Sequence, residues 1–211
     1  MVRQGLVYFS ICVAVLGACS APAEEMQGAT EVLQTAEQNQ DITYAPKIIT
    51  PDERRTVAYP GHGVSVLADM TDTAAGVYIQ EEIIPARSLG APPHIHEDED
   101  EYFIVLEGSI SFLNGEDVVV AGPGTVAILP RGHWHGFWNP NDTPTRMLLA
   151  VAPGHFGSFF DDVVARIRTE NAESPELIGA IIAQVAASRN VTVDIDRLPA
   201  DARPLLAPPG D

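Results

Sequence analysis

The sequence predicts an all-β sandwich or barrel that is followed by a short helical extension. Between about residues 44 and 153, short apolar runs alternate with turns rich in Gly, Pro, Asn and Asp. Many short strands at such regular spacing are typical of sandwiches and barrels. Beyond Gly154 the apolar residues recur at helical spacing instead. A chain of 211 residues, 45% of them hydrophobic, is long enough to build one such domain with additions at its ends.

Seven strands are expected in the first region, each ending at a turn signal. The turns are rich in glycine and proline, as in Asn114-Gly115 and Gly122-Pro123-Gly124. The expected strands are residues 64–69, 76–84, 102–106, 109–113, 117–120, 125–129 and 146–151.

Two helices are expected in the extension. The first is indicated by the apolar residues from Phe156 to Ile167. The second begins at Ser174, which can cap the first turn and is followed by Pro175, and it ends near Asn190. We expect both to pack on the barrel, because about 50 residues make a poor core alone.

The charge balance excludes two classes of partner. The chain carries 12 Lys and Arg against 29 Asp and Glu, a formal net charge of −17. Such a surface repels phosphate, which argues against nucleic-acid binding and against a polybasic grip on anionic lipid. The two cysteines, Cys12 and Cys19, both lie near the N-terminus, so the rest of the chain has no disulfide framework or Cys-rich zinc site.

Residues 1–18 have the features of a signal peptide. Arg3 precedes an apolar run that is too short to span a bilayer, which takes about 20 residues. The run ends in Leu-Gly-Ala before Cys19, which resembles the bacterial lipobox and implies that Cys19 carries lipid, including palmitate, as a membrane anchor. The alternative is a plain secretory signal cut after Ala23, which would release a soluble protein. Either way, we expect the protein at the cell envelope, facing the periplasm or the exterior.

The chain therefore divides into four predicted parts. They are the signal peptide at 1–18, a polar tether at 19–43, the barrel at 44–154, and the helical extension with its tail at 155–211. The tether is rich in Ala, Glu and Gln and would hold the barrel away from the membrane.

His94 and His96 are the first residues that point to chemistry. Residues two apart in a strand face the same side, so both imidazoles can approach one point. An acid a few residues later can supply a third ligand, and the segment around His135 supplies further histidine. Three neutral imidazoles and one carboxylate suit a divalent Fe, Mn, Ni, Cu or Zn ion.

Both segments resemble the two conserved motifs of the cupin superfamily. The first motif is matched by His94, His96, Glu101 and Gly108, although Gly90 lies three residues too close to His94 for the leading glycine. The second motif is matched at every fixed position, by Gly124, Pro130, Gly132, His135 and Asn139.

This resemblance implies a specific fold and a specific ligand set. The fold is a double-stranded β-helix, or jelly-roll, barrel with a short C-terminal helical extension. The ligands of one divalent transition metal would be His94, His96, Glu101 and His135. Because cupins are often dimers, the resemblance also implies a homodimer.

From about residue 60 to 193, the chain is similar to single-barrel bacterial cupins related to quercetin dioxygenases. That similarity implies a metal-dependent oxygenase, an oxidoreductase whose substrate is a small aromatic or enolic compound. Glu101 would then be the catalytic residue, accepting a proton from a substrate hydroxyl. Two alternatives stay open: a metal-dependent isomerase or lyase acting on a sugar or keto acid, and a non-catalytic protein that binds a small ligand or a metal.

The spacing also indicates residues around the expected metal. Phe103 and Phe137 lie two residues beyond Glu101 and His135, so we expect them to face a substrate pocket, with plain core packing as the alternative. His133 lies two residues before His135, so in an extended segment both would point to the same side. It is either a pocket residue or a histidine at the rim.

Other polar residues near these motifs have simpler expected roles. The acids at 97–100 could compete as ligands, but we expect a solvated loop at the barrel mouth. His62 and His155 are isolated in the sequence, and we expect them to lie on the surface or in loop packing.

Overall fold

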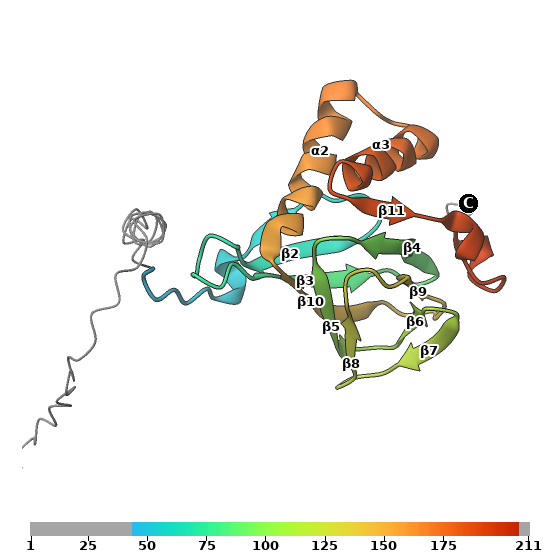
Figure 1. The fold of residues 1–211 in the computed structure, drawn as a ribbon, viewed down its shortest axis with the longest axis horizontal. Helices are drawn as coiled ribbons and strands as arrows, with labels where there is room; N and C mark the ends of the chain where they lie inside the picture. The colour runs from blue at the N-terminus through green and yellow to red at the C-terminus, as the bar shows by residue number, and fades with distance from the viewer. Residues whose placement is uncertain (1–43, 207–211) are drawn as a thin grey trace, which may run out of the picture. The chain divides into compact units, whose positions relative to one another are not determined.

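The computed structural model describes residues 44–206, which fold into two antiparallel sheets around a shared core (Figure 1). The first sheet has the order β1 (Arg55–Val57), β2 (Gly63–Ala68), β3 (Tyr78–Ile84), β10 (Thr145–Ala152), β5 (Asp100–Glu107), β8 (Val126–Leu129). The second has the order β11 (Val191–Val193), β4 (Ser88–His96), β9 (His135–Asn139), β6 (Ile110–Asn114), β7 (Asp117–Ala121). The predicted all-β barrel with a helical extension is confirmed.

The central strands of the first sheet alternate between buried and more exposed residues. In β5, Glu101, Phe103 and Val105 are buried while the residues between them are more exposed. Side chains along a strand point alternately to the two faces, so these three share the inner face. The acid is therefore carried into the barrel by the same pleat that buries its apolar neighbours.

Strand β4 extends beyond the histidine pair that we expected in a strand, and it contains Pro92 and Pro93, although proline removes a ladder N–H. The pairing of β4 with β9 explains how the prolines are tolerated. Ala91 pairs with Phe137 and His94 with His135, so two residues of β4 stand opposite one of β9. The prolines thus fall in a bulge, where the ladder is interrupted anyway.

Gly90, the glycine that departs from the cupin spacing, has a local role on β4. A Cβ atom at this position would lie 2.1 Å from the ring of Phe137. The absence of a side chain at Gly90 therefore lets Phe137 turn inward at the bulge.

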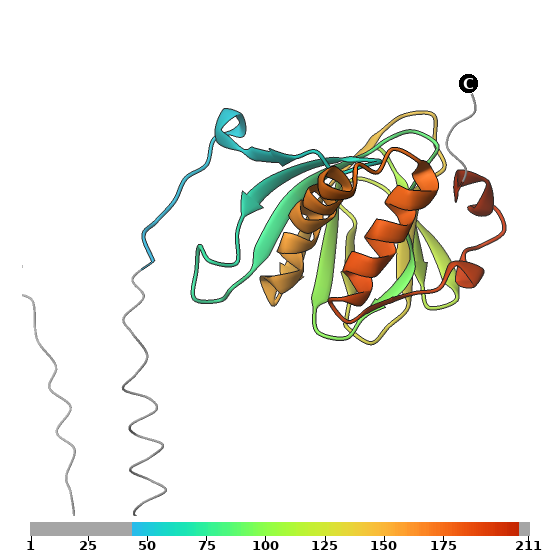
Figure 2. The ribbon, with the colours of Figure 1, turned by 90° about the horizontal axis from the view of Figure 1, so that it is seen from above.

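Helices α2 (Ser158–Glu170) and α3 (Pro175–Ala187) lie side by side over one side of the barrel (Figure 2). As predicted, Ser174 caps α3, its hydroxyl accepting a hydrogen bond of 3.2 Å from the N–H of Leu177. Helix α3 contacts β11, and α2 contacts β1. Both bury an apolar stripe in the main core, which makes them a cover for the barrel.

Several predictions concern parts of the chain outside residues 44–206. The signal peptide, the lipid on Cys19 and the polar tether all fall there. Within the described range, the structure has no helix long and apolar enough to cross a membrane.

Candidate metal centre

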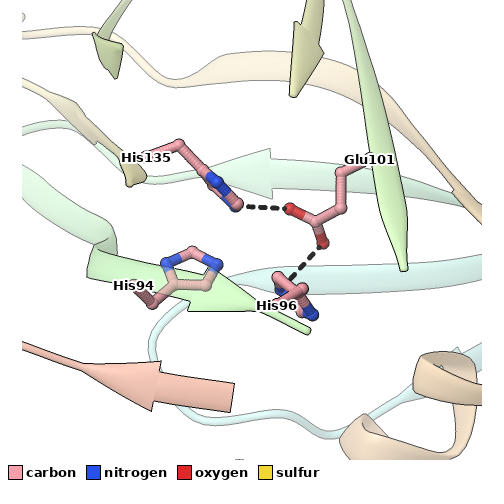
Figure 3. Close-up of side chains that lie close together, drawn as sticks. All are labelled: His94, His96, Glu101 and His135. Atoms are coloured by element: carbon pink, nitrogen blue, oxygen red, sulfur yellow. Dashed lines mark hydrogen bonds and ion pairs between the residues drawn. The ribbon is translucent and has the colours of Figure 1, made fainter. Parts of the chain in front are cut away.

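Four side chains converge inside the barrel (Figure 3). One ligand atom from each of His94, His96, Glu101 and His135 lies within 4.8 Å of the other three, and all four residues are buried. His135 Nε2 is 3.1 Å from Glu101 Oε2, and His96 Nε2 is 3.6 Å from Glu101 Oε1. Metal bonds of about 2.0–2.2 Å place neighbouring ligand atoms about 3 Å apart, so a small contraction would let this cluster hold an ion.

The strand register brings these residues together from three segments of the chain. His94 on β4 pairs directly with His135 on β9, and their ring centroids are 4.2 Å apart. His96 lies two residues along β4 on the same face. Glu101 reaches the cluster from β5 in the other sheet, so the site joins the two sheets.

Each imidazole is oriented through its Nδ1 atom. His94 Nδ1 donates to the Pro92 carbonyl at 2.8 Å, and His135 Nδ1 donates to the His133 carbonyl at 2.9 Å. A ring that donates from Nδ1 keeps the lone pair on Nε2 for a metal. His96 Nε2 is buried and has no hydrogen-bond partner among the described residues. An unsatisfied buried nitrogen facing a carboxylate fits a cation between them.

The electrostatics favour the metal-binding forms of two cluster residues, Glu101 and His94, whereas Glu101 and Glu99 outweigh burial and raise the pKa of His96. Burial alone would raise the pKa of Glu101, but His96, His135 and His94 outweigh it and hold that pKa below its usual range. Burial lowers the pKa of His94 to about 3. At neutral pH the carboxylate is therefore ionised and this imidazole is neutral, as metal coordination requires.

The acidic segment before Glu101 is more ordered than the solvated loop that we expected. Glu99 is buried, and its carboxylate lies 3.4 Å from His96 Nδ1. The carboxylate of Asp100 pairs with the Arg131 guanidinium at 2.9 Å. No local pattern signals this difference, because it depends on where β4 and β5 bring the short connection between them.

A cavity of about 90 Å³ lies beside the cluster, between the barrel and the helices. His94 and Glu101 form part of its wall, as do Phe103 and Phe137, which were expected in a pocket. Further wall residues come from the helical extension and β11: Phe156, Phe159, Phe160, Ile182, Ala186, Val191 and Val193. The extension therefore closes the cavity with apolar side chains.

Two further histidines were singled out in the sequence. His133 is exposed and outside the cavity wall, and its Nδ1 lies 3.1 Å from the Arg131 carbonyl, which fits the rim alternative. His62, which we expected in a surface or loop-packing role, lines the cavity instead. Glu82 also lines the cavity and was not singled out in the sequence.

The fold and the four converging side chains define a jelly-roll barrel with a His/Glu cluster that could hold a metal ion. Residues 80–151 match the family model described as "Cupin domain", a stretch that contains all four ligand residues. This match and the jelly-roll fold support the assignment of the barrel to the cupin superfamily.

The comparison with curated proteins finds one relative, "Oxidoreductase iacF" from Pestalotiopsis fici. It is 34% identical over 70 residues, which cover 33% of this chain and 34% of the relative. The match thus spans about a third of that protein's length.

Solved structures with a similar fold include the polyketide cyclase RemF from Streptomyces resistomycificus. It shares 26% identity at a TM-score of 0.44, covering 52% of this chain and 80% of that one. KdgF from Halomonas sp. shares 15% identity at a TM-score of 0.46, covering 52% and 94%. A predicted oxalate decarboxylase from Thermotoga maritima shares 18% identity at a TM-score of 0.45, covering 50% and 98%.

Proposed function

We propose that the protein is a metal-dependent oxygenase of the quercetin-dioxygenase-like cupin type, acting on a small enolic or aromatic compound. One observation carries the proposal. Three imidazoles and one carboxylate converge beside a cavity with aromatic walls. This donor set suits a divalent first-row metal, and the cavity suits an apolar substrate body.

The size of the cavity favours a compact substrate. A cavity of about 150 Å³ holds one benzene ring. The cavity here, at about 90 Å³, is smaller. Of the two proposed substrate types, a small enol therefore fits this cavity better than an aromatic compound such as a flavonol.

The proposed mechanism assigns separate roles to the cluster residues. His94, His96 and His135 would hold the metal through Nε2, and Glu101 through its carboxylate. A metal held there would supply Lewis-acid chemistry and orient a substrate oxygen. Glu101 is ionised, lines the cavity and can accept the proton of a substrate hydroxyl. The apolar walls keep bulk water away from that transfer.

Oxygen uptake tests the proposed reaction. Metal-loaded protein should consume O2 with at least one compound from a panel of small enols and enolisable ketones, and the substrate should persist under nitrogen. Substrate loss at equal rates under air and nitrogen would favour the isomerase or lyase alternative. The absence of any turnover would favour a binding protein.

We also propose that the barrel is tethered to a membrane through lipid on Cys19. The support is the short apolar run that ends at this residue. In detergent phase partitioning, the full-length protein expressed in a bacterial host should enter the detergent phase, and Cys19→Ser should stay in the aqueous phase. Two aqueous results would indicate the cut after Ala23 instead.

A further inference from the structure

The cavity carries a second group of polar side chains, apart from the metal cluster. Tyr59, His62 and Glu82 line it together with His94 and Glu101. Glu82 lies on β3 and Glu101 on β5, with β10 between these strands. The two acids therefore reach the same cavity from positions two strands apart.

Glu82 ends a buried line of hydrogen bonds along β3. Tyr78, Gln80 and Glu82 alternate along the strand, so all three point inward, and each is at most 2% exposed. The Tyr78 hydroxyl donates to Gln80 Oε1 at 2.8 Å, and Gln80 Nε2 donates to Glu82 Oε1 at 2.6 Å. The other oxygen, Glu82 Oε2, is buried without a hydrogen-bond partner among the described residues. A buried polar atom left in this state is costly unless something pairs with it.

The hydrogen-bond line also decides where a proton on Glu82 would lie. Because Gln80 donates to Oε1, that oxygen acts as the carbonyl acceptor, which favours a proton on Oε2. Burial raises the pKa of Glu82 to about 8, against the opposing effect of the Gln80 hydrogen bond. Glu82 is therefore mainly a neutral acid at pH 7, with an O–H available at the free oxygen.

His62 provides a second unpaired atom in the wall of the same cavity. Its Nε2 is buried and has no partner within residues 44–206. His62 directly precedes β2, the strand that pairs with the Glu82 strand β3, so both residues reach the cavity from this edge of the barrel. Burial lowers the pKa of His62 to about 4, so its ring is neutral.

The cavity wall contains no counter-charge for an anion at this end. None of the described residues that line it is Lys or Arg. A carboxylate or phosphate group placed against Glu82 and His62 would meet a neutral acid and a neutral imidazole only. Burying an unpaired negative charge there would cost free energy, whereas an uncharged oxygen function can accept a hydrogen bond without that cost.

We propose that the cavity binds a small uncharged compound with two oxygen functions, one at the His94–Glu101 cluster and one hydrogen-bonded by Glu82 Oε2 and His62 Nε2. The substrate class is thus a neutral hydroxyketone or its enol. The inference rests on the proposed function for the first oxygen, whereas the second oxygen depends on Glu82 and His62 alone.

Binding of hydroxyacetone to zinc-loaded protein, followed by ligand-observed NMR, tests this proposal. Acetone serves as the ligand with one oxygen, and pyruvate as the charged ligand of similar size. Hydroxyacetone should bind at least tenfold more tightly than acetone, and pyruvate should not outcompete it. Pyruvate binding more tightly, or no saturable binding of hydroxyacetone, would overturn the substrate class.

Variants of Glu82 separate a ligand contact from a structural role. Glu82→Leu should weaken hydroxyacetone binding about tenfold with zinc content unchanged, since it removes the donor. Glu82→Gln should recover most of that loss, because its amide can accept from Gln80 and still donate into the cavity. His155→Ala, an exposed histidine outside the cavity wall, is the matched control.

The outcomes keep the two proposals apart. Unchanged binding in a folded Glu82→Leu variant contradicts the role of Glu82, whatever the protein does with O2. A Glu82→Gln variant as weak as Glu82→Leu also contradicts it. Failure of the cluster to bind zinc defeats the metal-dependent function instead, and the Leu and Gln variants can still be compared on the metal-free protein.

Discussion

Two buried glutamates on the same sheet differ in protonation state at neutral pH: Glu101 is ionised and Glu82 is neutral. Glu101 and Glu82 are both 2% exposed, and burial raises the pKa of each. Glu101 faces three imidazoles, which reverse that effect and keep it ionised. Glu82 faces one amide donor and stays neutral over most of the physiological range. Burial does not decide the role of a carboxylate; its partners do, and here they produce one metal ligand and one hydrogen-bond donor.

The largest expected effect comes from removing the charge at Glu101. Glu101→Gln keeps the size and an oxygen ligand but cannot take a proton. If Glu101 is the base, the variant should keep much of its metal and lose turnover by about 10²–10⁴, the usual worth of a positioned base. Metal content and O2 uptake on the same sample check this. A loss of activity in step with the loss of metal would show that Glu101 is only a ligand.

The same substitution at the neutral acid, Glu82→Gln, should stabilise the protein at high pH. The pKa of Glu82 is raised from 4.5 to about 8, so between these values the unfolded chain releases a proton that the folded chain keeps. The contribution of Glu82 to the free energy of unfolding therefore falls by about 1.4 kcal/mol for each pH unit across that window.

Glu82→Gln removes this dependence. It should raise the free energy of unfolding at pH 8 by roughly 2–4 kcal/mol more than at pH 5. Denaturant titrations at the two pH values measure the difference. Equal changes at both would contradict the raised pKa.

A smaller effect is expected at Glu99, which supports the cluster indirectly. Its carboxylate lies 3.4 Å from His96 Nδ1 and helps to raise the pKa of that ring. Removing such a partner typically costs about 10–100-fold in metal affinity. Competition with a chelator should show this for Glu99→Ala, and Glu97→Ala, an exposed neighbour, is the control. Equal affinities would leave Glu99 without a role in the site.

The smallest effect is expected next to Glu101, at the partly exposed pair of Asp100 and Arg131. Ion pairs in contact with water contribute about 0–1 kcal/mol. Asp100→Asn should therefore change the free energy of unfolding by less than about 1 kcal/mol and leave metal content unchanged. A larger loss in denaturant titrations would show that this pair fixes the loop before the metal ligand.

The metal cluster could be predicted from sequence because its four residues lie in two short motifs that resemble those of cupins. His94 and His96 share a face through their spacing, and the motif around His135 is short and complete. The second polar group carries no such pattern. On β3, Tyr78 and Ile84 point inward while Ile79 and Ile83 point outward, so apolar residues occur on both faces and the alternation does not show that Glu82 is buried. His62 reaches the same cavity from the residue before β2, and nothing in the local sequence shows this.

The fold shows the same division between local and long-range information. Most expected strands match the structure because turn residues mark their ends. Only the histidine end of β4 could be predicted as extended, and its full length could not, since its prolines are accommodated by a bulge opposite β9. The covering role of α2 and α3 followed from the small size of the extension, but their part in the cavity wall depends on packing against strands far away in sequence.

The metal content of two histidine variants tests the central claim most directly. His135 lies in the cluster, and His133, two residues away, is exposed outside the cavity. Both variants, His135→Ala and His133→Ala, should keep the barrel folded. Elemental analysis should find about one first-row transition metal per chain in the wild-type protein and in His133→Ala, and little in His135→Ala. Equal metal in all three proteins would contradict the metal centre described here.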